Sequence, residues 1–339
     1  MPYNSAVGII AGLGATPTIA TFTLTDTSGA GSTGFFRVGT AFPKALVPAS
    51  RVLQATVGGV AVRTAIMQKN TWSDGSLRSC ILVGDAGAVS GTVTVKVRAV
   101  LGSQGTSGVD PWTYLGTQSD LSVEVTSHTG SSSGALANRT YSLASAIATT
   151  SRRWVQDDTP VCVRAFAWGH PSGEKHLMCL HYLDFWLSAG GSVVGVEWTP
   201  VMSQHWWIDD PFGDGAQTKE ARSYTATIKN GATTLDTRTI AGHAYYCQWA
   251  ALRPDNDEQH AKRHWLNKGS AMPRLRVEIG SQWLRRMMKA GYLPPIKQGL
   301  TGLTNSLSNT YVPLGTNNHR AAINGTGAYE GRGLVTNPD

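Results

Sequence analysis

The sequence predicts an all-β fold of two antiparallel β-sandwich or barrel-like domains, with a few short helices and an extended polar C-terminal segment. Glycine occupies 38 of the 339 positions, and charged residues make up only 15% of the chain. Short runs rich in valine, isoleucine and threonine alternate with Gly-Gly, Asp-Gly and Asn-Gly pairs. This combination is typical of short strands joined by tight turns.

The first domain is predicted over residues 21–126, because strand-like runs follow one another closely there. Gly58-Gly59 and Asp74-Gly75 are pairs that form tight turns between strands. Residues 1–20 are small and apolar, and we expect them to form an arm that packs on another surface. The predicted strands are Thr21–Thr25, Gly34–Val38, Arg51–Val57, Val60–Met67, Leu77–Val83, Thr92–Val100 and Leu121–Val125.

The second domain is predicted over residues 151–296, after a linker at 127–150 in which Tyr141–Thr149 forms a strand or a brief helix. Asn230-Gly231 is the strongest hairpin signal in this part of the chain. Long strands that meet at tight turns favour a large antiparallel sandwich. The predicted strands are Val161–Trp168, His176–Leu187, Val193–Trp198, Ser223–Lys229, Thr233–Ile240 and His243–Trp249.

Helices are predicted only towards the C-terminus. The two candidates are Asp255–Lys268 and Ser281–Ala290, and the second is followed by Gly291 and Pro294-Pro295. Residues 297–339 are rich in glycine, asparagine, threonine and serine. We expect them to form an extended tail or the start of a further module.

The hairpin of Trp72, Asp74, Gly75, Ser76 and Arg78 is the clearest local motif. Asp-Gly supplies the positive φ that a tight turn requires, and the Ser76 side chain is expected to bond back to the turn backbone. Arg78 is expected to pair with Asp74 or to reach another strand. Because such a motif stabilises a fold without any substrate, a structural role is favoured over a binding role.

The loop His205-Trp206-Trp207-Ile208-Asp209-Asp210 is the best candidate for a carbohydrate-binding site. Adjacent side chains of extended backbone point to opposite faces, so Trp206 and Trp207 do not both enter one core. Aromatic rings stack on sugars, and the Asp209 and Asp210 carboxylates can accept hydrogen bonds from hydroxyl groups. A subunit contact is an equally good interpretation, because aromatic residues are enriched there as well.

Catalytic and metal sites are not predicted. A polysaccharide lyase would need a base and a cation beside a uronate carboxylate. His205, Asp209 and Asp210 with Arg222 or Lys219 are an example of such a set, but nothing in the sequence fixes their geometry. No nucleophile elbow, phosphate-binding loop or dinucleotide fingerprint is present. The spacing of the histidines and Glu174 matches no metal-ligand set, so structural roles are expected for His170, Glu174, His176, His181, His243, His260 and His264.

The four cysteines are predicted to be reduced, buried thiols. Each lies in an apolar run and no two form a CxxC pair; they are Cys80, Cys162, Cys179 and Cys247. This usage is typical of a protein made in a reducing cytoplasm, and no cofactor is expected.

The formal net charge of +7 is compatible with nucleic acid or an anionic glycan as a partner, but no RNA- or DNA-binding motif is present, so nucleic acid is not expected. The basic residues are scattered, and the densest group, which is expected to serve solubility or a subunit interface, is Arg274, Arg276, Arg285, Arg286 and Lys289. No apolar stretch approaches about twenty residues, so no membrane insertion is expected. Met1-Pro2-Tyr3-Asn4 lacks the positively charged start of a signal peptide.

A family resemblance rests mainly on the first domain. Phe42-Pro43-Lys44, Pro48 and Gln68 lead into the hairpin Trp72–Arg78. This run resembles the leading domain of a family of large bacteriophage and prophage tail proteins. It is also similar to the barrel-like first domain of exo-rhamnogalacturonan-lyase-like proteins. The likeness to the tail proteins continues over most of residues 20–295, through Trp168, Trp206, Trp265, Met272-Pro273 and Tyr292-Leu293-Pro294.

The resemblance implies a virion protein of the tail tip, baseplate or tail fibre, assembled in the host cytoplasm. Its expected partners are other tail proteins, further copies of itself in a homo-oligomer, and a bacterial surface glycan. The alternative is a polysaccharide-active enzyme of the rhamnogalacturonan-lyase type, or an inactive remnant of one that binds carbohydrate.

Overall fold

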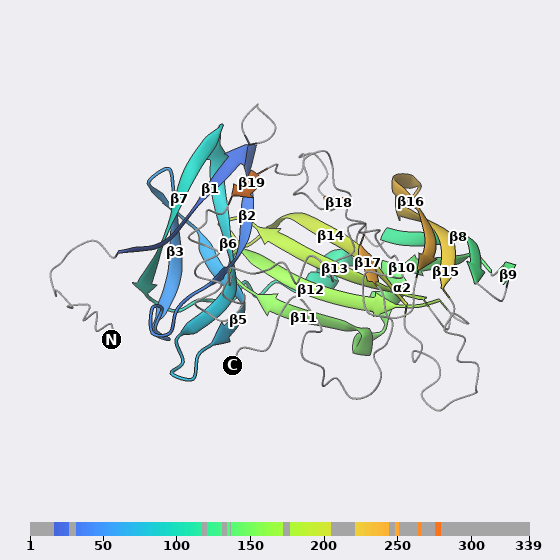
Figure 1. Ribbon diagram of the computed structural model, residues 1–339, viewed down its shortest axis with the longest axis horizontal. Coiled ribbons are helices and arrows are strands. Elements are labelled where there is room, and N and C mark those ends of the chain that lie inside the picture. Colours follow the sequence, from blue (N-terminus) through green and yellow to red (C-terminus); the bar gives the residue numbers. More distant parts are fainter. Residues whose placement is uncertain are drawn as a thin grey trace, which may run out of the picture.

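The computed structural model describes residues 17–26, 32–116, 121–130, 134–135, 137–171, 177–204, 221–243, 248–250, 264–265 and 275–278. Within these ranges the protein is mostly strand, arranged in antiparallel sheets, with two short α-helices. The sheets form two units that lie side by side along the long axis of the molecule (Figure 1). The predicted all-β class is confirmed.

The first unit is a sandwich of two sheets around a core that includes Phe22, Phe36 and Leu82. In β7, Val95, Val97 and Ala99 are buried whereas Lys96 is exposed, as the two-residue period of a strand requires. The larger sheet has the order β19 (Leu275–Glu278), β1 (Thr18–Asp26), β7 (Thr92–Leu101), β3 (Arg51–Val57), β4 (Val60–Val62). The smaller has the order β2 (Ser32–Ala41), β6 (Leu77–Val89), β5 (Thr64–Thr71).

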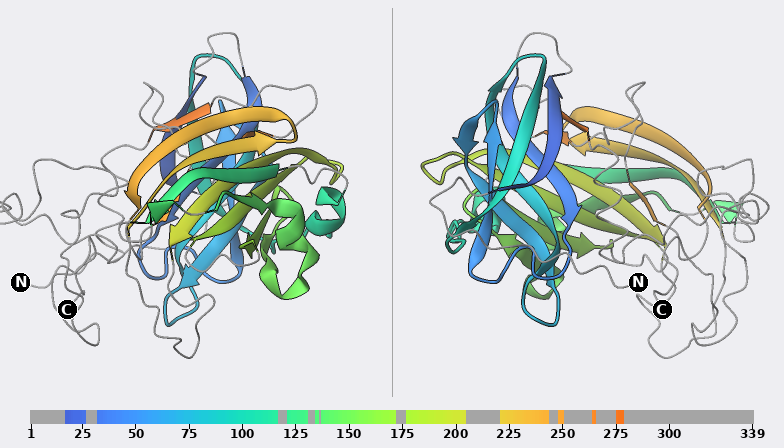
Figure 2. Two further views of the ribbon diagram at one scale, coloured as in Figure 1. Left: turned by 90° about the vertical axis from the view of Figure 1, so that its right-hand side faces the viewer. Right: turned by 60° about the vertical axis from the view of Figure 1, so that its left-hand side comes forward.

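The second unit also packs two sheets around one core, which includes Phe185, Trp198 and Tyr224. Figure 2 shows its β15–β16 hairpin curving over the other sheet. One sheet has the order β10 (Arg139–Ser142), β8 (Leu121–Gly130), β15 (Arg222–Asn230), β16 (Thr233–His243), with β9 (Gly134–Ala135) beside β8. The other, here called the platform sheet, has the order β11 (Arg153–Asp158), β12 (Cys162–Gly169), β13 (Leu177–Leu187), β14 (Val193–Gln204), β17 (Gln248–Ala250), with β18 (His264–Trp265) beside β14.

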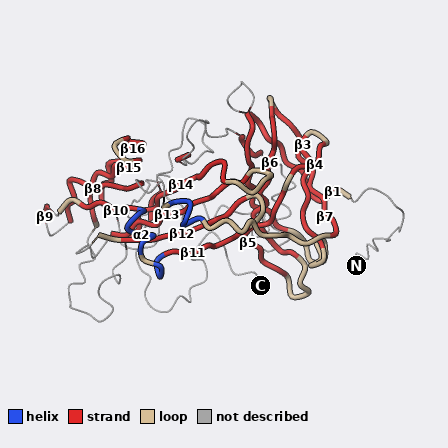
Figure 3. The backbone as a smooth tube through the Cα atoms, turned by 180° about the vertical axis from the view of Figure 1, so that it is seen from behind, coloured by secondary structure: helices blue, strands red, loops and turns tan. Residues whose placement is uncertain are grey.

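Both described helices belong to the second unit (Figure 3). Helix α1 (Pro111–Leu115) is capped by Asp110, whose side chain accepts a hydrogen bond from the Trp112 amide. Helix α2 (Leu143–Ala148) is capped in the same way by Ser142, and a 3₁₀ turn, η1 (Thr150–Arg152), leads from it into β11. The predicted strand-or-helix segment Tyr141–Thr149 thus contains the end of β10 and then α2.

A third apolar core joins the two units. Met67 and Val83 of the smaller sheet pack against Cys162 and Trp186 of the platform sheet. The Phe35 ring stacks on Trp186 with 4.8 Å between ring centroids. The smaller sheet is therefore covered on both faces, and the two units share one continuous apolar contact.

Several turns agree with the sequence. Strand β3 has the predicted bounds, and Gly58 (φ 56°) and Gly59 (φ 91°) form the turn from β3 to β4. Gly231 (φ 57°) follows Asn230 in the turn between β15 and β16. These positive φ values lie where L-residues with a side chain are strained, which explains the glycines.

The unit boundary differs from the prediction. Leu121–Val125, expected in the first domain, lies in β8, which pairs with β10 and β15 of the second unit. In the reverse direction, Leu275 of the predicted second domain lies in β19, which pairs with β1. Pairing between strands far apart in the sequence decides which unit each strand belongs to, and local composition does not reveal this pairing.

Two strand and helix predictions are also corrected. Val60–Met67 is not one strand, because β4 pairs with β3 in one sheet and β5 pairs with β6 in the other. His264–Trp265, inside the predicted helix Asp255–Lys268, pairs with β14 as β18. The rest of that helix, the helix Ser281–Ala290 and the tail 297–339 lie outside the described residues.

Candidate functional site

The hairpin motif forms a structural link between two segments of the first unit. The Trp72 amide donates to the Ser76 carbonyl (2.8 Å), and Gly75 has φ 78°. The Ser76 hydroxyl donates to Asp74 (2.6 Å) and accepts from the Ala45 amide (2.9 Å), so it connects the turn to a neighbouring loop. The hydrogen bonds from Ser76 hold the pKa of Asp74 below its ordinary value.

Arg78 makes a contact within the hairpin that we did not predict. Its guanidinium lies over the Trp72 ring, 4.8 Å from the centroid, in a cation–π contact. The Trp72 indole donates to the Phe42 carbonyl (3.0 Å). Trp72 is therefore held by two contacts. The hairpin motif is explained by its role in the local fold, without a ligand.

The predicted carbohydrate-binding loop lies in a part of the chain that the structure does not describe. His205, Trp206, Trp207, Asp209 and Asp210 lie outside the described residues, as do Lys219, Glu174, His176 and His260. Arg222, a candidate cation for a lyase, begins β15 and is buried.

Two of the predicted structural histidines are fully buried. His181 accepts a hydrogen bond from the Trp198 indole (3.2 Å), and burial lowers the pKa of His181 to about 3. The second, His243, lies 2.6 Å from the Tyr224 hydroxyl. Both side chains face other core residues, so their surroundings fit the structural role expected from the sequence.

The described cysteines are buried free thiols, as predicted. They are Cys80, Cys162 and Cys179, whereas Cys247 lies outside the described residues. Burial raises the pKa of the Cys80 thiol to about 12, so this side chain is uncharged at neutral pH.

The strongest candidate for a binding surface is an aromatic row on the outer face of the platform sheet. Trp154 on β11 pairs in register with Phe166 on β12, which pairs with Tyr182 on β13. The ring centroids are 5.3 Å and 5.1 Å apart. Trp154 is 46% exposed and Tyr182 38% exposed, so the row faces solvent rather than either core.

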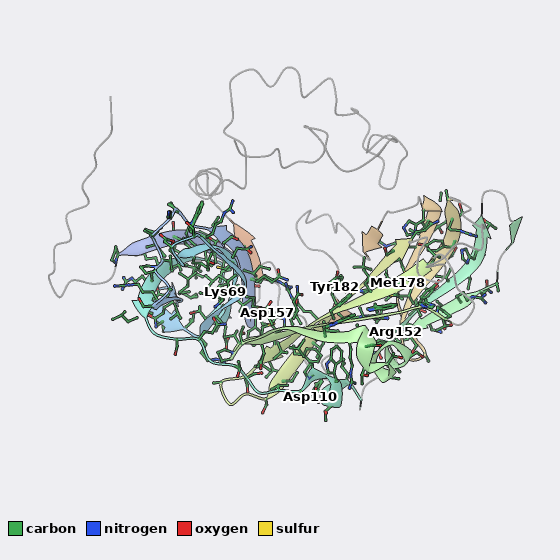
Figure 4. All side chains as sticks on the ribbon, turned by 90° about the horizontal axis from the view of Figure 1, so that it is seen from below. Lys69, Asp110, Arg152, Asp157, Met178 and Tyr182 are labelled. Atoms are coloured by element: carbon green, nitrogen blue, oxygen red, sulfur yellow. The ribbon has the colours of Figure 1, made fainter. Side chains whose placement is uncertain are left out.

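The sequence places these rings on one face by alternation. In β12, Val163, Ala165 and Ala167 enter the core, so Phe166 and Trp168 point outward. Figure 4 shows Tyr182 and Met178 of β13 on the side of the sheet away from Asp110 and α1. The outer face is therefore distinct from the face that builds the unit.

The packing of the rings decides which of their faces are free. The Trp154 and Phe166 rings are stacked at 19°, and the Phe166 and Tyr182 rings are tilted by 33°, so neighbouring rings cover part of each other's faces. Among the described strands β11 is the edge of the sheet and Trp154 is 46% exposed, so no described strand covers the outer side of its indole.

Polar and cationic groups border the row. The Arg152 guanidinium lies over the Trp168 ring at 4.8 Å, and His170 stacks on the same ring at 6.2 Å. These residues extend the outer face towards the end of β12 and give it a positive charge beside its aromatic surface.

A buried charge cluster lies one row further along the same face, towards the first unit. Arg164 donates to Asp184 (2.6 and 3.0 Å), and Arg37 of β2 bonds both Asp184 and Glu197. Although burial opposes ionisation, Arg37 and Arg164 hold the pKa of Asp184 below its ordinary value. Burial raises the pKa of Glu197, and Arg37 offsets this only in part. The two carboxylates are occupied in joining the units.

The described residues contain no group of three His, Cys, Asp or Glu side chains placed to hold a metal ion. No helix in this part of the chain has the length and apolar character needed to cross a membrane. No protein-family model matches the chain, and no curated protein matches it by sequence.

Sequence reasoning missed the aromatic row. Phe166 and Tyr182 lie in strands that were predicted, whereas β11, which carries Trp154, was not recognised as a strand. The available signal was the alternation of aromatic residues with small ones in Phe166-Ala167-Trp168. Which residues pair across the sheet cannot be read from one strand alone.

Proposed function

We propose that the protein is a structural component of a bacteriophage tail, in the tip, baseplate or fibre, that also binds a glycan of the host surface. The observation that carries the binding role is the exposed row of Trp154, Phe166 and Tyr182. Exposed aromatic groups fixed on a rigid sheet are typical of interaction sites. The apolar C–H faces of a sugar ring stack on such side chains.

The small width of the aromatic row favours a narrow ligand, such as a glycan chain, over a protein partner. Mutual stacking already holds the rings in place, so little side-chain entropy is lost when a ligand binds. The row is three residues wide and is bordered by Arg152 and His170. A stable protein interface of standard size would need about 800 Å² on each partner, with an apolar centre.

The tail assignment is supported by the resemblance of the Trp72–Arg78 hairpin to phage tail proteins. The continuous core between the two units is compatible with it, because a virion part must keep its shape in an assembly. Mass spectrometry of purified virions tests this role. We expect the chain at a fixed copy number, and its absence from particles would contradict the assignment.

Trp154→Ala tests the binding role. The purified variant is expected to bind host surface polysaccharide about tenfold more weakly than the unmodified chain, equivalent to ~1.4 kcal/mol, because one stacking face is lost. Isothermal titration calorimetry measures the affinity.

Val60→Ala is the control, since Val60 is an exposed apolar side chain on β4 of the first unit. It should bind as the unmodified chain does. Circular dichroism checks that both variants fold. Unchanged affinity in a folded Trp154→Ala variant would contradict a role for the row.

A further inference from the structure

A cavity of about 610 Å³ lies where the two units meet. Its walls come from β3 and β5 of the first unit, from residues 102–106, and from Asp157–Thr159 at the end of β11. Cavities of this size hold small molecules or one to two sugar residues. Figure 4 shows Lys69 and Asp157 near each other at this junction.

The wall formed by residues 102–106 is fixed in place. The Gln104 side-chain amide donates to the Ile66 carbonyl (2.8 Å), and its oxygen accepts from the Ile66 amide. Gln104 therefore satisfies the edge of β5 as a neighbouring strand would. A short way on, the Ser107 amide donates to Asp158 (2.9 Å), which ties the same segment to β11.

Two cations line the cavity. Lys69 is exposed, and among the described residues no carboxylate forms an ion pair with its ammonium group. Arg51 uses one guanidinium nitrogen to donate to the Ala99 carbonyl (2.7 Å), which fixes the side chain and leaves further donors. The cavity thus has two positive groups able to bind an anion.

Two carboxylates also line the cavity: Asp158 is bonded by Ser107, whereas Asp157 has acceptor capacity to spare. Among the described residues, the Asp157 carboxylate accepts one long hydrogen bond, from the Gln68 amide at 3.3 Å to each oxygen. Both backbones are irregular at this contact: the β11–β12 register shifts between Val155 and Asp157, and Gln68 has φ 46°. Irregularities of this kind change the direction in which side chains point at a strand edge.

We infer that this cavity binds the acidic residue of a glycan, with Lys69 and Arg51 on its carboxylate and Asp157 accepting from its hydroxyl groups. The inference rests on the proposed glycan-binding function and names the substrate class. The register shift also places Asp157 opposite Arg164, on the face that carries Trp154 and Phe166. Trp154 and Asp157 are three residues apart on one strand, within about 10 Å, so adjacent sugars of one oligosaccharide can reach both.

Matched acidic and neutral hexasaccharides test the inference on the full chain. The pairs are oligomannuronate with β-1,4-mannohexaose, and oligogalacturonate with its carboxyl-reduced form, and titration calorimetry measures each affinity. The acidic member of at least one pair should bind about tenfold or more tightly than its neutral counterpart, and only its binding should weaken with added salt.

Lys69→Gln should remove most of the affinity difference between the acidic and neutral hexasaccharides. It should change the affinity for the neutral members by less than twofold. Lys96→Gln is the matched control, because Lys96 is an exposed lysine on β7 away from the cavity, and it should change neither affinity. Equal binding of acidic and neutral members in both pairs, or equal weakening of both by Lys69→Gln, would overturn the inference while leaving glycan binding intact. Failure of all four to bind would count against glycan binding itself.

Discussion

At the scale of single residues, burial sets the protonation state of the histidine and cysteine side chains for which the sequence predicts structural roles. His181 and Cys80 are enclosed in cores, and each is held in its uncharged form by the absence of water. The residues that we assign to ligand binding, such as Trp154 and Lys69, belong to no sequence motif that we recognised. The chemical reactivity of a residue type therefore does not indicate where the proposed binding site of this protein lies.

His181 should make stability depend on pH. Its pKa is about 6.5 when exposed and about 3 when folded, so the folded state binds its proton less readily. Its contribution is fully present above pH ~6.5 and is lost as the pH falls towards 3, by roughly 1.4 kcal/mol per pH unit. Urea unfolding at pH 7, 5 and 4 measures this slope.

His181→Asn is the comparison for that experiment. Asparagine keeps an acceptor for the Trp198 indole but does not titrate. The variant should be less stable at pH 7 and should lose stability less steeply than the unmodified chain between pH 6.5 and 4. Parallel curves for the two proteins would contradict a neutral, buried His181.

At the scale of elements, the close packing of strands matters as much as their hydrophobic pattern. β2 and β6 are neighbours in the smaller sheet, and the Phe36 ring of β2 lies directly over Gly84 of β6. Gly39, also on β2, has open space where a side chain would begin. Two glycines in one sheet thus meet different constraints, which their sequence contexts do not distinguish.

Gly84→Ala should destabilise the protein by about 1–3 kcal/mol, because its methyl group would overlap the buried Phe36 ring. Gly39→Ala should change stability by less than about 1 kcal/mol and serves as the control. Thermal unfolding compares the two. A loss of equal size in both variants would show that backbone freedom, rather than the contact with Phe36, is the reason for Gly84.

At the scale of the whole molecule, the two units are joined by an apolar core and by buried charge. Arg63 of the first unit donates to the carbonyls of Pro160, Leu187 and Ser188, at 2.6–3.1 Å. Arg37 reaches the two carboxylates of the platform sheet. Because the contact buries groups from both sides, we expect the units to unfold together rather than one after the other.

Arg37→Met should therefore destabilise the protein strongly, by about 3–5 kcal/mol, because Asp184 and Glu197 would each lose an ion pair with Arg37 while remaining buried. Lys229→Met, which breaks the Lys229–Glu124 pair near the surface, should cost at most about 1 kcal/mol. Guanidinium unfolding with two spectroscopic probes measures both values. A small effect of Arg37→Met would show that the apolar core alone joins the units.

The sequence by itself determined the all-β class, most strands of both units, the glycine turns at Gly58-Gly59 and Asn230-Gly231, and the buried state of the described cysteines. These features depend on neighbouring residues: alternation, turn chemistry and composition act over a few positions. Only the tertiary structure decided that β8 belongs to the second unit, that β19 returns to the first, and that Trp154, Phe166 and Tyr182 form one row beside the Lys69 cavity. Those features depend on strand pairing between residues far apart in the chain, which no local pattern encodes.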